Sequence, residues 1–349
     1  MHVGSQISFS EENMMFLRQM GVEYVDSTPH GGLGLEEDGY WHADALMRHR
    51  ERVESYGLKL AAMHLPLTSG GIERQVWPNI MLGTPERDRD IEKVCKCIEA
   101  AAKAGIPTLL YNLAILPVIR TPYRTPGRGG VTYSHFDYEE LKNDPPLPYA
   151  PVTAEQAWER ISYFVERVIP VAEEFKVRMG CHQHDPGMPA GVGYRGIERV
   201  LGSIEGVKRF IALHPSPYHG LNFCQGTVSE MCTDPNQVYE AIYYFASRKR
   251  IFWVHFRNIR GGFSKFDEVF PDEGDIDMIR ALRTYRAAGY DGVLVPDHVP
   301  YSDIDSRQGH RARAFCLGYI KAAIQAVELS PGGCRPGPRA RAVRQGLDW

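Results

Sequence analysis

The 349 residues are enough for one large domain or two ordinary ones, and 43% hydrophobic with 24% charged residues is the composition of a globular protein. A formal net charge of −3 gives no reason to expect a nucleic acid or an anionic membrane as a partner. No apolar run approaches the roughly 20 residues of a membrane-spanning helix, and no signal-peptide pattern opens the chain, so we expect a soluble, cytoplasmic protein. Seven cysteines without a framework spacing favour reduced thiols.

Short apolar strands and amphipathic helices alternate along most of the chain. Strands are expected at residues 2–8, 22–26, 58–64, 108–113, 175–179, 210–214, 220–224, 251–255 and 292–296, and helices at about 10–20, 44–56, 85–104, 153–175, 237–247, 276–288 and 307–329. Such alternation predicts a parallel sheet, and the length suits a (β/α)8 TIM barrel of about 250 residues with insertions. A doubly wound open sheet is the alternative, but no Gly-x-Gly-x-x-Gly follows the first strand.

Two segments interrupt this alternation. Residues 117–151 are rich in Pro, Gly, Tyr and Arg, and we expect an inserted loop over the active site, with a floppy insertion as the alternative. Residues 330–349 are rich in Pro, Gly and Arg, and we expect a tail that is ordered only if it docks. Residues 1–329 then form a single barrel domain.

Polar side chains that can bind a metal or move protons follow many of the predicted strands, whose C-terminal ends form the active site of a barrel. They are His64, Asn112, His182, His184, His214, Cys224, His255, Asp297 and His298. Imidazole and carboxylate together suit Mn²⁺, Fe²⁺ or Zn²⁺, so we expect a divalent-metal site with spare acid/base groups. The alternatives are structural, because His214 precedes a proline and Cys224 fits an inert buried thiol.

Substrate contacts are expected from the remaining strand-end residues. Arg257 and Asn258 lie just past His255, and the planar guanidinium of an arginine pairs bidentately with a carboxylate. His64, Asn112 and His214 are the other candidates for substrate binding.

Several motifs, spread in order over about residues 50–325, carry a resemblance to a known family. They are the segment 85–92, Gly105-Ile106-Pro107, Tyr111-Asn112, His182-Gln183-His184-Asp185-Pro186, Gly220-Leu221-Asn222-Phe223-Cys224-Gln225-Gly226, His255-Phe256-Arg257-Asn258, Gly289-Tyr290-Asp291-Gly292 and Pro296-Asp297-His298. Together they resemble the mannonate dehydratase family, within the xylose-isomerase-like barrels. The chain departs from the family pattern at Gln183 and His184, and at Val299-Pro300-Tyr301 after His298.

The resemblance implies a Mn²⁺- or Fe²⁺-dependent lyase that removes water from D-mannonate to give 2-keto-3-deoxy-D-gluconate, as a homodimer. The metal ligands it implies are His182, Cys224, His255 and Asp297; Zn²⁺ also suits these ligands. His298 would be one acid/base residue.

The second acid/base role is open between His184, Tyr301 and a metal-bound water, and Tyr319 is a further candidate for the family's catalytic tyrosine. The departures leave room for a diverged member that acts on another sugar acid. Two other functions stay open: a metal-dependent sugar isomerase or epimerase on the same barrel, and a non-catalytic protein that binds a sugar acid.

Overall fold

The computed structural model describes residues 1–29 and 31–329, so the expected tail at 330–349 lies outside the described residues. In this part of the chain, none of the helices combines the length and apolarity needed to cross a membrane.

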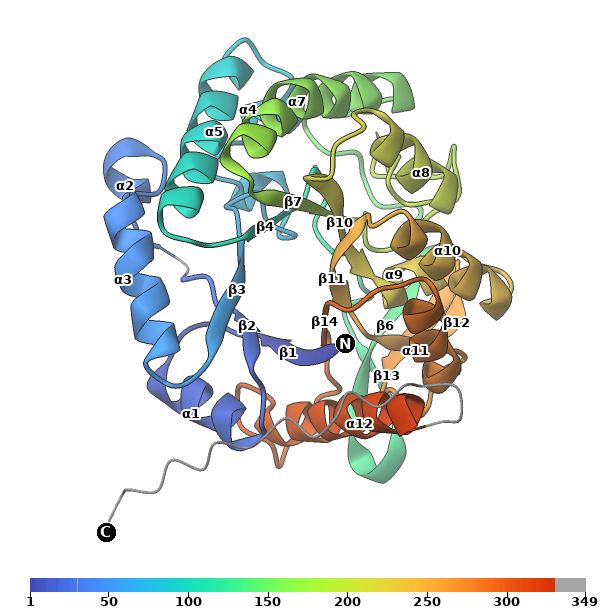
Figure 1. The fold of residues 1–349 in the computed structure, drawn as a ribbon. Helices are drawn as coiled ribbons and strands as arrows, with labels where there is room; N and C mark the ends of the chain where they lie inside the picture. Colours follow the sequence, from blue (N-terminus) through green and yellow to red (C-terminus); the bar gives the residue numbers. More distant parts are fainter. Residues whose placement is uncertain (30, 330–349) are drawn as a thin grey trace.

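Within residues 1–29 and 31–329, eight parallel strands close into a barrel that helices surround (Figure 1). The barrel strands are β1 (His2–Gln6), β2 (Tyr24–Asp26), β3 (Lys59–His64), β4 (Thr108–Tyr111), β7 (Arg178–His182), β10 (His219–Cys224), β11 (Ile251–His255) and β14 (Val293–Val295). Their order around the barrel is β1-β14-β11-β10-β7-β4-β3-β2. This confirms the predicted (β/α)8 barrel.

The helices are α1 (Glu11–Gln19), α2 (Leu35–Asp38), α3 (Ala43–Glu54), α4 (Asn79–Leu82), α5 (Arg87–Lys103), α6 (Tyr138–Leu141), α7 (Ala154–Phe175), α8 (Ile204–Ala212), α9 (Gln225–Glu230), α10 (Pro235–Ser247), α11 (Met278–Ala287) and α12 (His310–Leu329). Local capping fixes where several of them begin. In α7, for example, Thr153 and Gln156 form a reciprocal capping box, which satisfies backbone N–H groups that the helix leaves free.

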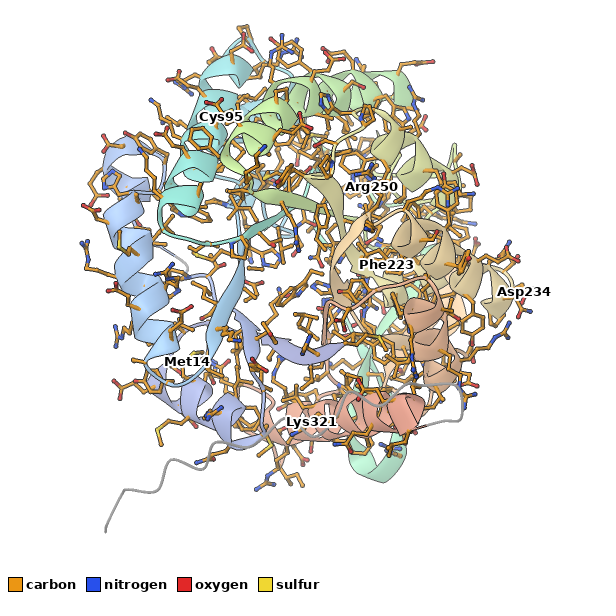
Figure 2. All side chains as sticks on the ribbon, viewed as in Figure 1. Met14, Cys95, Phe223, Asp234, Arg250 and Lys321 are labelled. Carbon is orange, nitrogen blue, oxygen red and sulfur yellow. The ribbon has the colours of Figure 1, made fainter. Side chains whose placement is uncertain are left out.

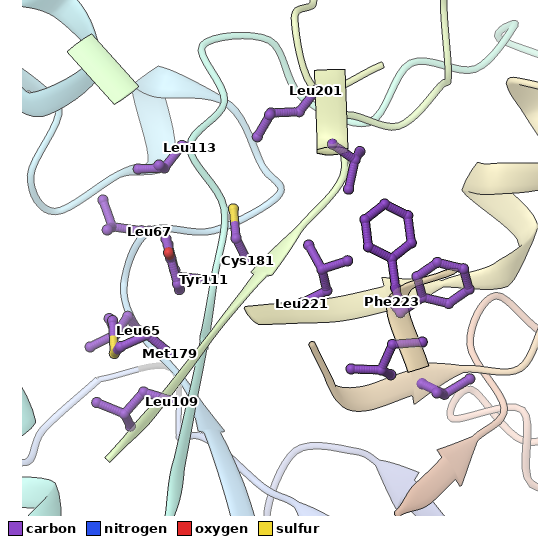
Figure 3. Packing of buried hydrophobic residues seen from close by; sticks show 14 of the residues in the cluster. Leu65, Leu67, Leu109, Tyr111, Leu113, Met179, Cys181, Leu201, Leu221 and Phe223 are labelled. Carbon is purple, nitrogen blue, oxygen red and sulfur yellow. The ribbon is translucent and has the colours of Figure 1, made fainter. Parts of the chain in front are cut away.

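The barrel strands are apolar on both faces, because one face meets the helices and the other lines the interior. Leu109 and Tyr111 of β4 pair with Met179 and Cys181 of β7, and all four belong to the layer between strands and helices (Figure 3). Leu110 lies between the first two in sequence and belongs to the separate cluster inside the barrel. Side chains fill the layer from both sides, with Met14 of α1 and Phe223 of β10 fully buried in it (Figure 2).

The expected strand at 210–214 is wrong. Residues 204–212 form α8, which begins after Ser203, whose hydroxyl oxygen accepts a hydrogen bond from the N–H of Gly206. A short apolar run does not by itself distinguish a buried strand from one face of a helix, and the N-cap serine was the signal that distinguishes them.

The expected inserted loop is partly folded. It contains β5 (Arg124–Pro126) and β6 (Thr132–Asp137), which pair antiparallel. β6 also pairs with β13 (Lys265–Val269), and β13 pairs with β12 (Asn258–Gly262), giving a sheet in the order β12-β13-β6-β5 among the described residues. A small hairpin, β8 (Gly193–Tyr194) and β9 (Ile197–Glu198), follows β7. The insertion is therefore joined to the chain that follows β11.

Candidate metal centre and catalytic site

Neighbouring barrel strands bring four of the predicted side chains to one end of the barrel. His182 ends β7, Cys224 ends β10 and His255 ends β11. Cys224 pairs with His255, and His255 pairs with Val295, two residues before Asp297. Because parallel strands in register present their carboxyl ends at one level, these side chains converge at the barrel mouth.

The donor atoms lie close enough to share one cation. Those of His182, Cys224 and His255 all lie within 4.8 Å of one another. Oδ2 of Asp297 lies 3.4 Å from Nδ1 of His255 and 3.8 Å from Sγ of Cys224. The carbonyl of Gln183 lies 2.6 Å from Nδ1 of His182, which leaves the other ring nitrogen for a ligand. Both ring nitrogens of His255 are buried without a hydrogen-bond partner, as expected of a metal ligand seen without its ion.

The electrostatics of this cluster favour a cation. Burial raises the pKa of the Cys224 thiol, but the charge of Arg257 and the adjacent imidazoles of His182 and His255 hold the pKa well below its ordinary value. Burial likewise opposes ionisation of Asp297, yet the charge of His255 holds the pKa of this carboxyl well below its usual range. The pKa of His255 is lowered by burial but raised overall, to about 10, by Asp297 and Cys224. An excess of negative charge therefore surrounds this ring.

Arg257 does not lie in a position to clamp a substrate carboxylate, which corrects the expectation from sequence. Its side chain is 2% exposed, and its guanidinium forms ion pairs with four carboxylates of the protein, one of which is Asp297, 3.3 Å from Nε. The other distances are 2.9 Å to Asp185, 2.8 Å to Glu268 and 3.1 Å to Glu230. Arg120, from the inserted segment, also binds Asp185, at 2.6 Å. Arg257 instead stabilises the thiolate of Cys224, whose Sγ lies 3.4 Å from Nη2.

His298 lies at the edge of this buried charge network and is its accessible part, with a side chain 37% exposed. Its Nδ1 lies 2.6 Å from Oε1 of Glu268 on β13. Burial lowers the pKa of His298, but the negative charges of Asp297 and Glu268 raise it to about 9. The imidazole is therefore protonated at neutral pH, with Nδ1 held by Glu268. Asp185, Glu268 and His298 also lie within 4.8 Å of one another, but the two arginines neutralise this group of carboxylates.

Three expected site residues have other roles in the structure, which corrects those expectations. His184 is buried, with Nε2 2.9 Å from the carbonyl of Leu113 and Nδ1 accepting from the N–H of Leu201, so neither nitrogen is free to move a proton. Burial lowers its pKa to about 3. His214 follows α8 and precedes β10, at the end of the barrel opposite to the metal ligands, where it lies 3.9 Å from Glu173.

Asn258 is the third correction, because its side-chain amide is fully committed to the backbone. Its Nδ2 donates to the carbonyls of Pro271 and Ile276, and its Oδ1 accepts from the N–H groups of Ile259 and Ile276.

Of the remaining candidates, His64 and Asn112 lie at the ends of other barrel strands, whereas Tyr301 and Tyr319 lie after the last strand. His64 ends β3, where its Nδ1 lies 2.5 Å from the buried carboxylate of Asp26. Asn112 follows β4 and is buried. Tyr301 is 55% exposed, and its ring lies over the guanidinium of Arg124, 5.5 Å away. Tyr319 lies on α12 with its ring near Phe315, at 6.5 Å.

Sequence reasoning missed the charged residues that hold this site together. They are Asp26, Arg120, Glu230 and Glu268. Asp185 joins them as an ion-pair partner of both Arg120 and Arg257. Each lies in a different segment, so no local motif joins them. The signal that was available is Asp185 itself, inside the His182–Pro186 motif.

Comparison with known proteins gives one family. The sequence model of D-mannonate dehydratase (UxuA) matches residues 13–147 and 146–330. The chain is 29% identical to the mannonate dehydratase of Thermotoga maritima over 293 residues, and 30% identical to that of Streptococcus uberis over 286 residues; each match covers 74% of this chain and 78% of the relative. A crystal structure of mannonate dehydratase from Streptococcus suis serotype 2 superposes with a TM-score of 0.83, covering 99% of both chains at 24% identity. A D-tagatose 3-epimerase-like protein shares the fold at a TM-score of 0.57 and 16% identity.

Proposed function

The chain belongs to the D-mannonate dehydratase family, and we propose that it is a divalent-metal-dependent enzyme that removes water from D-mannonate to give 2-keto-3-deoxy-D-gluconate. Membership makes it a hydro-lyase acting on a sugar acid. The observation that carries the metal dependence is the convergence of His182, Cys224, His255 and Asp297 at the barrel mouth. Mn²⁺ or Fe²⁺ is the proposed cofactor, and Zn²⁺ suits the same ligands.

The reaction removes the proton on C2, α to the carboxylate, and expels the hydroxyl on C3. A bound divalent cation supplies Lewis acidity, which stabilises the negative charge that develops on the substrate as C2 loses its proton. Cys224 and Asp297 would hold this cation as anions, because their pKa values are depressed. His182 and His255 would complete the ligand set.

We assign His298 the role of general acid toward the leaving hydroxyl. Glu268 holds Nδ1 and its negative charge raises the pKa of His298, which favours the protonated ring, so Nε2, 3.8 Å from Oδ1 of Asp297, is the nitrogen left to donate a proton. Protonation of the C3 hydroxyl lets it leave as water. The second acid/base role stays open between Tyr301 and a metal-bound water, with Tyr319 as a further candidate, because the ring of His184 is committed to the backbone.

The direct test is to incubate the chain with D-mannonate and measure the 2-keto-3-deoxy acid that is released. We expect product with the metal-replete protein, none with the protein held in a chelator, and product again after Mn²⁺ is added back. A chelated protein that is fully active would contradict the metal dependence. A metal-replete protein that releases no product from D-mannonate would contradict the substrate.

Cytoplasmic location, assembly into a homodimer and the absence of nucleic-acid and membrane partners stay predictions from the sequence.

A further inference from the structure

A cavity of about 500 Å³ opens at the same end of the barrel as the metal ligands, beside β1, β2 and β3. Its polar wall contains Gln6, Asp26, His64, Arg74, Gln308 and Arg313. The register of β1 and β14 places it next to the metal cluster. Val3 pairs with Leu294. Gln6 lies three residues after Val3, and Asp297 lies three residues after Leu294, so the two reach the same level of the barrel. The cavity is of the size that small-molecule ligands occupy.

Arg313 is a cation without a counter-ion in this wall. Its guanidinium forms no ion pair with residues 1–29 or 31–329, and its Nε is buried without a hydrogen-bond partner. Its Nη1 makes one long contact, 3.4 Å, to the backbone carbonyl of Gln6. Burial lowers its pKa, and the negative charges of Asp297 and Asp305 oppose this without forming an ion pair with it. A partly buried, unpaired guanidinium is costly unless an anion binds it, and its planar fork fits a carboxylate.

Two further groups in the wall suit hydroxyls. Oε1 of Gln6 is buried without a donor. The carboxylate of Asp26, whose side chain is 1% exposed, holds Nδ1 of His64. The His64 side chain is 19% exposed and lines the cavity, so its Nε2 is the nitrogen left for a ligand there. Asp26 is itself held by the hydroxyl of Thr28, at 3.2 Å. A carboxylate that fixes an imidazole in this way gives the ring one orientation and one tautomer.

We propose that this cavity is the sugar-acid subsite, in which Arg313 binds the substrate carboxylate and the Asp26–His64 pair binds its hydroxyl groups. The inference rests on the proposed function, since a hexonate supplies one carboxylate and several hydroxyls. It fills the role that Arg257 cannot take, because the guanidinium of Arg257 is already bound to Asp185, Glu230 and Glu268.

The test measures binding of D-mannonate and of D-mannitol, its counterpart without the carboxylate, to the Mn²⁺-loaded chain by calorimetry. Every protein carries His298→Asn, so that D-mannonate is consumed at least about 10²-fold more slowly during the titration. In this background Arg313→Gln should weaken D-mannonate binding by about 10- to 100-fold, as the loss of a charged hydrogen-bonded pair does, and change D-mannitol binding less than about threefold. Asp26→Asn should weaken both ligands alike.

Arg311→Gln is the matched control, because Arg311 is exposed on the same helix and lies outside the cavity; it should bind both ligands as the parent does. Arg313→Lys keeps a charge and should lose less D-mannonate affinity than Arg313→Gln. If Arg313→Gln does not fold, the same comparison of D-mannonate and D-mannitol binding is made with Arg313→Lys.

Equal losses for both ligands in the Arg313 variants, unchanged D-mannonate affinity in them, or no D-mannonate binding to the parent would each overturn the proposal. Failure of the proposed function is distinguishable from these outcomes. If the proposed function is wrong, the unmodified enzyme releases no product from D-mannonate. If only the subsite is wrong, the unmodified enzyme releases product, but Arg313→Gln binds D-mannonate as tightly as the parent does.

Discussion

Cys224 owes its chemistry to the backbone and side chains around it. It caps α9, where the N–H of Thr227 lies 3.4 Å from Sγ, and Nη2 of Arg257 lies at the same distance on another side. Gly226 makes this approach possible, since a Cβ there would meet the guanidinium of Arg257 at 2.7 Å. A helix N-terminus and a guanidinium both favour a thiolate, which is the form that binds a metal.

Replacing this thiolate tests its role as a ligand. Cys224→Ala should lower metal affinity by more than about tenfold, because one anionic donor is lost. The measurement is metal content after dialysis against graded free Mn²⁺. Cys181→Ala is the control, because Cys181 is equally buried at the neighbouring strand but burial raises its thiol pKa, so it stays protonated. Equal metal content in Cys224→Ala and the parent would make Cys224 a structural residue.

His298 should be needed for turnover but not for metal binding. His298→Asn removes the proposed general acid and should lower kcat by about 10²- to 10⁴-fold, with metal content unchanged. Steady-state kinetics and metal analysis of the same preparation measure both quantities. A variant with the kcat of the parent would remove His298 from the mechanism.

Glu268 should set the pH range in which His298 works. Its negative charge helps raise the pKa of His298 to about 9, so activity that requires the protonated ring is present below this pKa and lost as the pH rises through it. Glu268→Gln removes that charge, and the alkaline limb of kcat should move to lower pH. Asp267→Asn is the control on the same strand, because Asp267 binds His135 instead. An alkaline limb at the same pH in Glu268→Gln and the parent would contradict the account.

The β12–β13 hairpin is the element that brings Glu268 to the barrel mouth, and Asn258 fixes its start. The amide of Asn258 satisfies buried backbone groups of Pro271, Ile276 and Ile259. The hairpin pairs with β6 of the insertion, which also supplies Arg120 to the charge network. These hydrogen bonds and ion pairs therefore connect the insertion and the β12–β13 hairpin to the barrel.

Asn258→Ala should lower the apparent free energy of unfolding by about 2–4 kcal/mol, because several buried backbone groups lose their partners. Urea titration followed by circular dichroism measures the change. Asn236→Ala, at the exposed start of α10, is the control and should change it by less than about 0.5 kcal/mol. A loss for Asn258→Ala no larger than that of the control would show that these hydrogen bonds carry little stability.

The sequence predicts the barrel elements better than the elements beside the site. Apolar runs such as Leu109-Leu110 and Ile251–His255 are strands because both of their faces are buried, and their order alone indicates a barrel. The run at 210–212 is similarly apolar but lies on α8, and Leu213 is the C-cap of that helix. In the antiparallel sheet, β6 pairs with β13, more than 100 residues away, and no local pattern specifies that pairing.

At the scale of the whole molecule, the closed barrel explains which side chains can meet. Strand ends far apart in sequence, such as His182 and Asp297, reach one mouth because every strand runs in the same direction. The sequence could therefore supply the candidate ligands by strand position. It could not supply the contacts of Arg257 or the counter-ion-free state of Arg313, which depend on side chains from several separate segments.

Metal-dependent dehydration is tested by titrating the metal-stripped chain with Mn²⁺ while D-mannonate dehydration is followed. We expect activity to rise from zero in proportion to the metal added and to reach its maximum at one Mn²⁺ per chain, because one cluster of four ligands would hold the ion. Full activity without metal, or bound metal at one per chain without any dehydration, would contradict this expectation.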